Sequence, residues 1–511
     1  MSTARITLVR DFTLGGVPRR LFGSFVEHMG RSVYTGIFEP GHPEADENGF
    51  RTDVLELVKE LGPTVVRYPG GNFVSGYNWE DGVGPVDKRP RRLDGAWHTV
   101  ESNAFGLHEF VDWSKLAGTE IMEAVNLGTR GVDAARELVE YANHPGGSYL
   151  SDLRKRNGAA EPFDIKLWCL GNELDGPWQI GHKSAHEYGR LAQEAGKAMR
   201  FVDPDIELVA VGSSHCSMPT FGEWEHTVLT HAYEEVDYVS LHAYYQENDG
   251  DVKSFLATAV DMDYFIESVV STVDAVRAAG KHTKHINLSF DEWNVWYQRG
   301  LDTDDQPHQV AKGWREHPRL IEDAYNVTDA IVVGTLLNSL LRHGDRVKIA
   351  NQAQLVNVIA PIRSEENGPA WRQSIFWPFA RMAELARGQI LRASVDSDKY
   401  ESAQFGDVDV VDVSATWDDE SGRVALFVAN RGLDEPADVD VSLYGFVGGR
   451  VTRAEVLSVP DGADRFAANT LEAGEQVGLV PLPGVIVNGN RLRFALPALS
   501  WAVVEVEVTR A

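Results

Sequence analysis

Two glutamates follow strand-like runs of the sequence, and carboxyl groups in such places can act as acids or nucleophiles. Glu173 comes after the apolar run 165–170, and Glu292 comes after a second such run at 286–290. A carboxyl group at the mouth of a buried strand loses hydration but stays open to a ligand, which is the environment that can turn it into a general acid. Two glutamates at two strand ends therefore indicate glycoside chemistry.

Cleavage of a glycosidic bond needs one group that protonates the leaving oxygen and another that stabilises or traps the charge on the anomeric carbon. In the retaining route the two carboxyl groups stand about 5 Å apart, and the nucleophile forms a covalent glycosyl-enzyme. We assign Glu173 as the acid/base and Glu292 as the nucleophile, with one proton shared between them, mainly on Glu173. Arg67, at the end of another strand-like run, is the cation expected to keep Glu292 ionised.

The hydrophobic pattern between about residues 21 and 387 predicts the elements that position these glutamates. Short apolar runs alternate with segments of helical spacing, which is typical of repeated βα units. Helices are expected at 133–142, 184–202, 265–279 and 321–342. The strand candidates are 21–26, 64–68, 120–125, 165–170, 207–211, 238–241, 286–290 and 347–350. Eight such units predict a (β/α)8 TIM barrel, whose active site lies at the carboxyl ends of the strands.

Polar residues follow most of these strand candidates and would meet on one rim of the barrel. In chain order they are Glu27 and His28, 69–72, Asn126, Asn172 and Glu173, 212–215, 242–244, Asp291 and Glu292, and 351–354. Each of them alone is better explained as a turn or a helix cap. Their repetition at successive strand ends is what favours a site.

The pattern changes after about Arg387 to short alternating runs separated by Gly, Asp and Pro. These runs are 408–415, 424–429, 437–443, 451–457, 477–482, 491–496 and 501–508. We predict a barrel domain over residues 18–387 and an antiparallel, jelly-roll-like β-sandwich over 388–511. Residues 1–17 are assigned to the sandwich because they contain the strand-like segment 5–9. The polar segment 299–315 is expected to be a surface loop that can wall the substrate cleft.

Composition and charge restrict the partners of the chain. Its 511 residues carry a formal net charge of -28, with a pI near 5.0, so a nucleic acid or an anionic membrane would be repelled. The first residues lack the apolar stretch of a signal peptide and no segment could span a bilayer, so we expect a cytoplasmic protein. Cys169 and Cys216 are expected to be buried free thiols, with a disulfide left open.

Six segments carry longer motifs. They are GSFVEHMGR at 23–31, RYPGGNFVSGYNW at 67–79, LGNELDGPWQIGH at 170–182, VSLHAY at 239–244, FDEWNVWY at 290–297 and AQLVNVIAPI at 353–362. Together they resemble the α-L-arabinofuranosidases of glycoside hydrolase family 51, from near the N-terminus to about Phe379. The resemblance implies a retaining, exo-acting enzyme that removes terminal non-reducing α-L-arabinofuranosyl residues from arabino- and arabinoxylo-oligosaccharides by double displacement, with Glu173 as acid/base and Glu292 as nucleophile.

The resemblance also implies roles for the residues around the two glutamates. Asn172 would hydrogen-bond the sugar 2-hydroxyl, since an amide donates and accepts without adding charge. Tyr244 would orient the nucleophile. The furanose hydroxyls would be held by three polar side chains, those of Glu27, Asn72 and Gln354. The pocket would be lined by Trp97 and Trp296, with Trp178 nearer the leaving group, although plain core packing stays open for these aromatic residues.

The resemblance also implies a homohexamer, but the sequence leaves the natural oligosaccharide and its linkage open. For His28 and His242 a structural role is at least as well supported as a functional one. Two features depart from the family pattern: Ala243 stands where relatives often carry a polar residue, and segment 299–315 is longer than usual. Both could alter contacts with the leaving group, but neither touches the catalytic glutamates.

Three other functions fit parts of the pattern. A metal-dependent hydrolase would use Glu27, His28, His242 and a further carboxylate as ligands. Adjacent strand residues such as Glu27 and His28 point to opposite faces, however, and no His-X-His pair occurs, so no metal or cofactor is expected. A carbohydrate-binding protein would use the tryptophans without turnover. A related barrel glycosidase would act on pyranosides, and only the resemblance argues against it.

Overall fold

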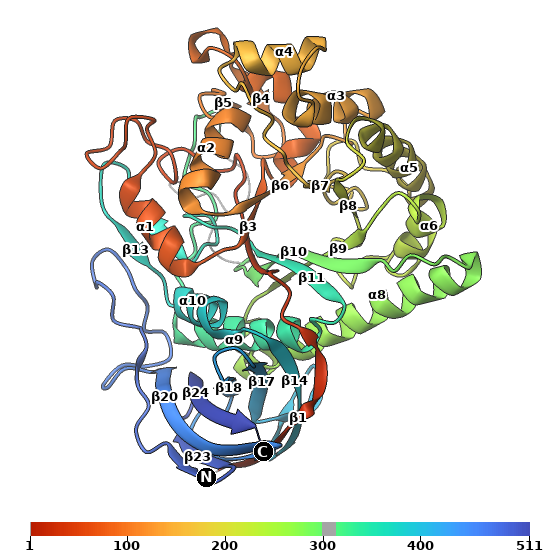
Figure 1. Cartoon of the computed structure of the whole chain (residues 1–511). Helices are drawn as coiled ribbons and strands as arrows, with labels where there is room; N and C mark the ends of the chain where they lie inside the picture. The colour runs from red at the N-terminus through yellow and green to blue at the C-terminus, as the bar shows by residue number, and fades with distance from the viewer. Residues whose placement is uncertain (1, 299–312, 511) are drawn as a thin grey trace.

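Eight parallel strands form a closed barrel in the computed structural model, which describes residues 2–298 and 313–510 (Figure 1). Each strand pairs with the next around the ring, and β11 closes on β2. The strands are β2 (Arg20–Phe25), β3 (Val65–Tyr68), β6 (Glu120–Ala124), β7 (Leu167–Cys169), β8 (Glu207–Ala210), β9 (Tyr238–Tyr245), β10 (Asn287–Val295) and β11 (Val347–Gln352). All eight lie at the predicted strand candidates, so the predicted TIM barrel is confirmed.

Most of the helices surround this barrel on its outer side (Figure 1). Their bounds are α1 (Thr52–Leu61), α2 (Leu107–Ala117), α3 (Val132–Asn143), α4 (Tyr149–Arg156), α5 (Ala185–Val202), α6 (Glu223–Ala232), α7 (Val252–Leu256), α8 (Ala259–Gly280), α9 (Val327–Arg342) and α10 (Phe376–Leu385). The Ser184 hydroxyl caps the start of α5. The helix expected from residue 321 begins only at Val327, because the Asn326 side chain accepts hydrogen bonds from the Thr328 and Asp329 amides and caps it there.

A ten-stranded sheet packs below the barrel in Figure 1, and both termini lie on it. Its strands, in spatial order, are β21 (Val480–Pro481), β20 (Phe446–Ser458), β24 (Ser500–Arg510), β18 (Arg423–Asn430), β17 (Val411–Asp418), β14 (Gln389–Ser397), β1 (Ser2–Gly16), β19 (Ala437–Tyr444), β23 (Arg491–Leu496) and β22 (Ile486–Asn488). β1 pairs antiparallel with β14 and parallel with β19, so this N-terminal strand is part of the same sheet. β22 lies against β20, so the predicted sandwich is one curled, mostly antiparallel sheet around its own core.

Some predicted strands of this region differ in the structure. The run 408–415 divides into β17 and the short β16 (Gly406–Asp409), which forms a hairpin with β15 (Lys399–Ser402). The run 477–482 contributes only β21, two residues long. β14 was absent from the prediction because only Ile390 and Leu391 of its nine residues are buried, so its sequence lacks an alternating apolar pattern.

Helix α9 connects the two layers. It is buried along almost its whole length, because it packs against β10 and β11 on one side and against β17, β18 and β24 on the other. The contact with β24 is close at Gly334, where an added Cβ would lie 2.3 Å from the Trp501 ring. A glycine in the middle of this helix therefore allows the barrel and the curled sheet to approach each other.

Short elements complete the rim of the barrel. They are the hairpins β4 (Arg92–Asp94) with β5 (Thr99–Glu101) and β12 (Ile362–Ser364) with β13 (Ala370–Arg372), and the 3-10 helices η1 (Asn72–Gly76), η2 (Trp79–Gly82) and η3 (Val86–Lys88). Among the described residues no helix has the length and apolar character needed to cross a membrane. Cys169 and Cys216 are both free, as predicted, but Cys216 is only partly buried.

Candidate active site

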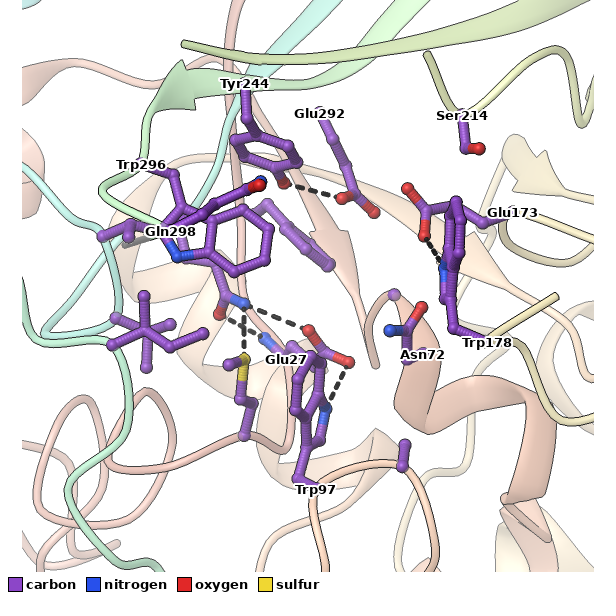
Figure 2. Close-up of a pocket in the computed structure, with 18 of the residues that line it drawn as sticks. Glu27, Asn72, Trp97, Glu173, Trp178, Ser214, Tyr244, Glu292, Trp296 and Gln298 are labelled. Carbon is purple, nitrogen blue, oxygen red and sulfur yellow. Dashed lines mark hydrogen bonds between the residues drawn. The ribbon is translucent and has the colours of Figure 1, made fainter. Parts of the chain in front are cut away.

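A pocket of about 650 Å³ opens at the carboxyl ends of the barrel strands (Figure 2). The structure brings together nine of the predicted site residues in its lining: Glu27, Asn72, Trp97, Glu173, Trp178, Tyr244, Glu292, Trp296 and Gln354. The two other predicted residues, Arg67 and Asn172, lie buried behind this lining and hydrogen-bond to it. Residues far apart in the sequence thus meet at one end of the barrel.

Glu292 lies within β10 and not after it, because β10 continues to Val295 alongside an equally extended β9. Its Oε1 accepts a hydrogen bond from Arg67 Nη1 at 2.6 Å, and its Oε2 accepts one from the Tyr244 hydroxyl at 2.7 Å. The Arg67 side chain is only 1% exposed, so the guanidinium charge acts on Glu292 with little screening by water. This is the cation contact that was expected for the second glutamate.

Glu173 follows β7 in a tight turn. Gly171 and Glu173 both have a left-handed backbone, with φ of 99° and 44°, a conformation that a non-glycine residue keeps only where its surroundings hold it. Trp178 Nε1 donates a hydrogen bond to Glu173 Oε2 at 2.8 Å. A carboxylate oxygen of Glu173 and one of Glu292 lie within 4.8 Å of each other.

His242 connects the acidic groups of the site. Its Nε2 lies 3.0 Å from Asp291 Oδ1, while its Nδ1 lies 2.9 Å from Glu173 Oε1 and 3.6 Å from Glu292 Oε2. Burial lowers the pKa of His242, but the charge of Glu292 and the hydrogen bonds with Asp291 and Glu173 outweigh this and raise the pKa to about 10. The imidazole is therefore a cation at neutral pH, a role that the sequence left undecided.

His28 lies outside the pocket. Its Nδ1 is 3.0 Å from Glu101 Oε2 and its Nε2 is 2.8 Å from the Tyr68 hydroxyl, and it does not line the pocket, whereas Glu27 does. His28 is a structural histidine.

Glu27 forms a buried group with Trp97, as Figure 2 shows, and with Gln354. Its Oε1 accepts hydrogen bonds from the Phe73 amide and from Trp97 Nε1, both at 2.9 Å, and its Oε2 accepts one from Gln354 Nε2 at 3.1 Å. Burial, aided by the charge of Glu292, raises the pKa of Glu27 to about 8, although the hydrogen bond from Phe73 opposes the shift. Trp97 reaches the pocket from the turn between β4 and β5, a place that no strand-end pattern predicts.

Asn172 and Asn72 extend the hydrogen-bonded chain that starts at Glu292. Arg67 Nη2 donates to Asn172 Oδ1 at 2.6 Å, and Asn172 Nδ2 donates to Asn72 Oδ1 at 3.2 Å. The orientation of Asn172 is thereby fixed by the same arginine that contacts Glu292.

The aromatic residues of the pocket occupy different depths. The rings of Tyr244 and Trp296 meet edge to face with centroids 5.1 Å apart. Trp97 is 8% exposed, whereas Trp178 is 52% exposed and stands at the mouth. All three tryptophans line the pocket in addition to packing against their neighbours.

Several lining residues were missed from the sequence. An apolar wall is formed by Met29, Ile321, Val358 and Ile359, and Gln298 also lines the pocket, beside Trp296 in Figure 2. Ile321 and Ile359 have left-handed φ of 50° and 36°, and the Ile359 amide donates to the Ile321 carbonyl at 2.9 Å. Apolar residues in loops carry no signal that separates a pocket wall from a core.

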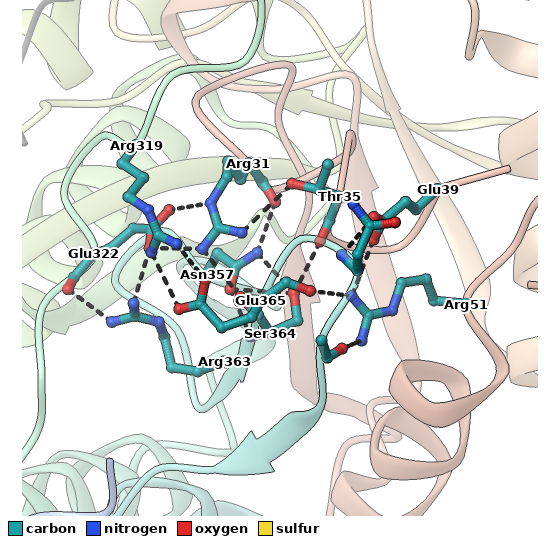
Figure 3. Close-up of polar contacts among 12 residues, drawn as sticks. Arg31, Thr35, Glu39, Arg51, Arg319, Glu322, Asn357, Arg363, Ser364 and Glu365 are labelled. Atoms are coloured by element: carbon teal, nitrogen blue, oxygen red, sulfur yellow. Dashed lines mark hydrogen bonds and ion pairs between the residues drawn. The ribbon is translucent and has the colours of Figure 1, made fainter. Parts of the chain in front are cut away.

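A buried ion-pair network holds this apolar wall in place (Figure 3). The Glu322 carboxylate, which is 1% exposed, accepts hydrogen bonds from Arg31 at 2.7 and 2.9 Å, from Arg363 at 2.8 Å and from Arg319 at 3.0 Å. The Asn357 amide donates to the Arg31 carbonyl and to the Ser364 hydroxyl, both at 2.9 Å. The segments that carry Ile321, Val358 and Ile359 are thus tied to the loop after β2.

Ala243 does not line the pocket, because it is 1% exposed and belongs to the core. Its side chain points away from the site along β9, so the expected effect of Ala243 on contacts with the leaving group is wrong. Most of segment 299–315 lies outside the described residues. Its end does contact the β4–β5 hairpin, since the Val100 amide donates to the Arg315 carbonyl at 3.0 Å.

Two groups of described residues place three possible metal ligands close together: Glu173, His242 and Glu292 in the pocket, and His215, Cys216 and Asp261 beside it. In the first group the imidazole is a cation with both nitrogens facing carboxylates. The two ring nitrogens already contact Glu173 and Asp291, an arrangement that suits proton transfer among these groups.

Comparisons with known proteins agree with this geometry. The family models described as the α-L-arabinofuranosidase 1 domain and the α-L-arabinofuranosidase C-terminal domain match residues 57–258 and 291–500. An intracellular exo-α-(1→5)-L-arabinofuranosidase of Streptomyces lividans is 56% identical over 98% of this chain and 75% of its own. An exo-α-(1→6)-L-arabinofuranosidase of Bifidobacterium longum is 50% identical over 99% and 98%.

A solved structure gives the same result. The family 51 α-L-arabinofuranosidase from Bifidobacterium longum superposes with a TM-score of 0.93 at 48% identity, covering 99% of both chains. The similarity includes the barrel, the curled sheet and every element that contributes to the pocket. The chain is a glycoside hydrolase and belongs to the family 51 α-L-arabinofuranosidases.

Proposed function

We propose that this enzyme removes terminal non-reducing α-L-arabinofuranosyl residues with retention of configuration, through a covalent glycosyl-enzyme. The observation that carries the proposal is the approach of carboxylate oxygens of Glu173 and Glu292 to within 4.8 Å. Retaining glycosidases hold their two carboxyl groups about 5–5.5 Å apart, whereas inverting enzymes need about 6.5–9.5 Å to admit a water molecule. The short separation favours direct attack by one carboxylate.

Glu292 is the proposed nucleophile. Its two oxygens accept hydrogen bonds from Arg67 and Tyr244, which hold the carboxylate in one orientation and stabilise its charge. In the first step a Glu292 oxygen forms an ester bond with the anomeric carbon while the bond to the leaving oxygen breaks. Tyr244 and Arg67 would stabilise the same carboxylate again when water displaces it.

Glu173 is the proposed acid/base. It lies closer to the pocket mouth than Glu292, beside the exposed Trp178, and can donate its proton to the departing oxygen. In the second step it takes a proton from the water that attacks the anomeric carbon, which frees Glu292. The positive charge of His242 would stabilise Glu173 as a carboxylate between the two steps.

The remaining lining residues would bind the sugar. Asn172, with its orientation fixed by Arg67, is proposed to contact the 2-hydroxyl. Hydrogen-bonding groups for the other furanose hydroxyls are proposed to come from Glu27, Asn72 and Gln354, and the apolar ring surfaces from Trp97, Trp296 and, on the leaving-group side, Trp178.

The proposed substrates are short arabino- and arabinoxylo-oligosaccharides. A 650 Å³ pocket suits a terminal sugar with part of its leaving group, and the net charge of -28 suits neutral glycans. Relatives of similar identity are named for (1→5) and for (1→6) linkages, so both linkages should be assayed. We also propose a cytoplasmic location, supported by relatives named intracellular, and a homohexamer, which light scattering after gel filtration would test.

A panel of 4-nitrophenyl glycosides tests the activity. We expect turnover of the α-L-arabinofuranoside and none of the xylopyranoside or glucopyranoside. Glu292→Ala should abolish turnover of every substrate. Glu173→Ala should still release an activated leaving group, and added azide should accelerate its second step and give an arabinosyl azide of retained configuration. An azide product of inverted configuration from Glu173→Ala would show that the two roles are exchanged.

A further inference from the structure

Three side chains with metal-binding atoms lie close together beside a smaller cavity that adjoins the catalytic pocket. His215 and Cys216 lie in the loop between β8 and α6, and Asp261 lies in the first turn of α8. A ring nitrogen of His215, the Sγ atom of Cys216 and a carboxylate oxygen of Asp261 lie within 4.8 Å of one another. The proposed glycosidase mechanism uses neither Cys216 nor Asp261.

The separations of these atoms are close to those around a tetrahedral ion. Zinc binds sulfur at about 2.3 Å and histidine nitrogen or carboxylate oxygen at about 2.0–2.2 Å, so two of its tetrahedral ligands lie about 3.3–3.6 Å apart. Cys216 Sγ lies 3.5 Å from Asp261 Oδ1 and 3.9 Å from His215 Nδ1. Cys216 Sγ is thus already at the ligand spacing from Asp261, whereas the His215 nitrogen and the Asp261 oxygen, which lie within 4.8 Å of each other, would close to that spacing around an ion.

The cavity gives an ion a route to these ligands. It has a volume of about 230 Å³, includes His215 and Asp261 in its lining, and shares His215, Tyr244 and Trp296 with the catalytic pocket. All three candidate ligands are partly exposed. A fourth coordination position would therefore face the cavity and stay open to water.

The present hydrogen bonds of the cluster are compatible with metal binding. His215 Nδ1 is 2.7 Å from the Ser217 hydroxyl and accepts from the Ser217 amide at 3.1 Å, contacts that an ion would replace. The Tyr245 hydroxyl donates to Asp261 Oδ2 at 3.1 Å, which leaves Oδ1 for the ion and would orient the carboxylate from behind.

We propose that His215, Cys216 and Asp261 bind a divalent cation of the zinc class at the edge of the catalytic pocket, and that the bound ion obstructs the leaving-group side. The thiol favours zinc over magnesium or calcium, which prefer oxygen ligands. On binding, the sulfur–hydrogen bond gives up its proton to solvent and a sulfur–metal bond forms. The ion carries two positive charges and the thiol loses one proton, so the pocket side where Glu173 lies would gain one net positive charge.

Cobalt(II) is the probe for binding, because a thiolate ligand gives it a charge-transfer band in the near ultraviolet. Titration of the full chain should produce this band with a stoichiometry of one ion, and zinc should remove it by competition. Cys216→Ser should abolish the band. Asp261→Asn should weaken cobalt binding by about 100-fold, because losing even a residue that only orients a ligand costs up to about that much in metal affinity. The matched control is His186→Ala, which removes one member of an exposed histidine pair whose nitrogens lie 3.0 Å apart and should leave the band unchanged.

The activity arm rests on the proposed function, whereas the spectroscopic arm does not. Zinc should inhibit arabinofuranoside hydrolysis with the same midpoint as the cobalt competition, and Cys216→Ser and Asp261→Asn should keep wild-type activity without zinc and resist its inhibition. Thermal melts of both variants exclude misfolding. The proposal is overturned if cobalt gives no thiolate band, or if zinc inhibits both variants as strongly as wild type, which would place the inhibitory ion at Glu173, His242 and Glu292.

Discussion

The variant Tyr244→Phe loses the hydrogen bond from Tyr244 to Glu292, and the strength of that bond sets the expected loss of kcat/KM. Burial and the charge of Glu292 hold the pKa of Tyr244 well above 10, so the hydroxyl is a donor throughout the working range of pH. A hydrogen bond to an ionised acceptor contributes about 1.5–3 kcal/mol. If the bond acts fully on the nucleophile in the transition state, its loss lowers kcat/KM by roughly 10- to 150-fold.

The substitution removes one oxygen and keeps the ring. The edge-to-face contact with Trp296 should persist, and the melting temperature should change little. The neighbouring Tyr245→Phe is the matched control, since its hydroxyl donates at 3.1 Å to Asp261, outside the proposed catalytic group. Steady-state kinetics on 4-nitrophenyl α-L-arabinofuranoside measure both. If Tyr244→Phe keeps kcat/KM within twofold of wild type, or falls no further than Tyr245→Phe, the reasoning on nucleophile orientation is refuted.

Three further predictions concern the surroundings of the glutamates. Because the pKa of His242 is raised from 6.5 to about 10, its stabilising effect is fully present below pH 6.5 and is lost as the pH rises through 10. His242→Gln should therefore lower the melting temperature most near pH 6 and least above pH 10, and a deficit that does not vary with pH would contradict this. Glu322→Gln leaves buried guanidinium groups without their carboxylate, so urea unfolding should show a free energy of unfolding lower by about 3–5 kcal/mol. The control is Glu384→Gln, which changes an exposed ion pair and should cost less than about 1 kcal/mol. Equal losses in the two variants would argue against the network. Trp178→Phe removes the hydrogen bond from the half-exposed Trp178 side chain to Glu173, so kcat/KM should fall about fivefold while the melting temperature stays unchanged. A large loss of stability would instead indicate that Trp178 acts as a core residue.

The barrel could be predicted because its signals are local. Each strand is a short apolar run, and the residue after it is polar because it faces the pocket, so chain order alone leads to the rim. Glu173 and Glu292 were recognisable for this reason. The sequence did not reveal that β9 and β10 extend beyond their apolar runs, because His242, Tyr244 and Glu292 interrupt the apolar pattern with polar side chains of the site.

The parts that sequence reasoning missed depend on contacts between distant segments. The bridging role of His242 exists only because β7, β9 and β10 bring Glu173 and Asp291 to either side of one ring. Ile321 and Ile359 face the pocket because of backbone conformations that β-branched residues rarely adopt, held by the Glu322 network. No propensity or spacing rule expresses such constraints.

The stereochemistry of transfer tests the central claim that Glu173 and Glu292 act by double displacement. The measurement is the proton NMR spectrum of the first product formed from 4-nitrophenyl α-L-arabinofuranoside in water containing methanol, since a methyl glycoside cannot mutarotate. The two carboxylate oxygens within 4.8 Å predict methyl α-L-arabinofuranoside, the product of retention. Methyl β-L-arabinofuranoside as the first product would contradict the covalent intermediate and with it the assignment of Glu292 as nucleophile.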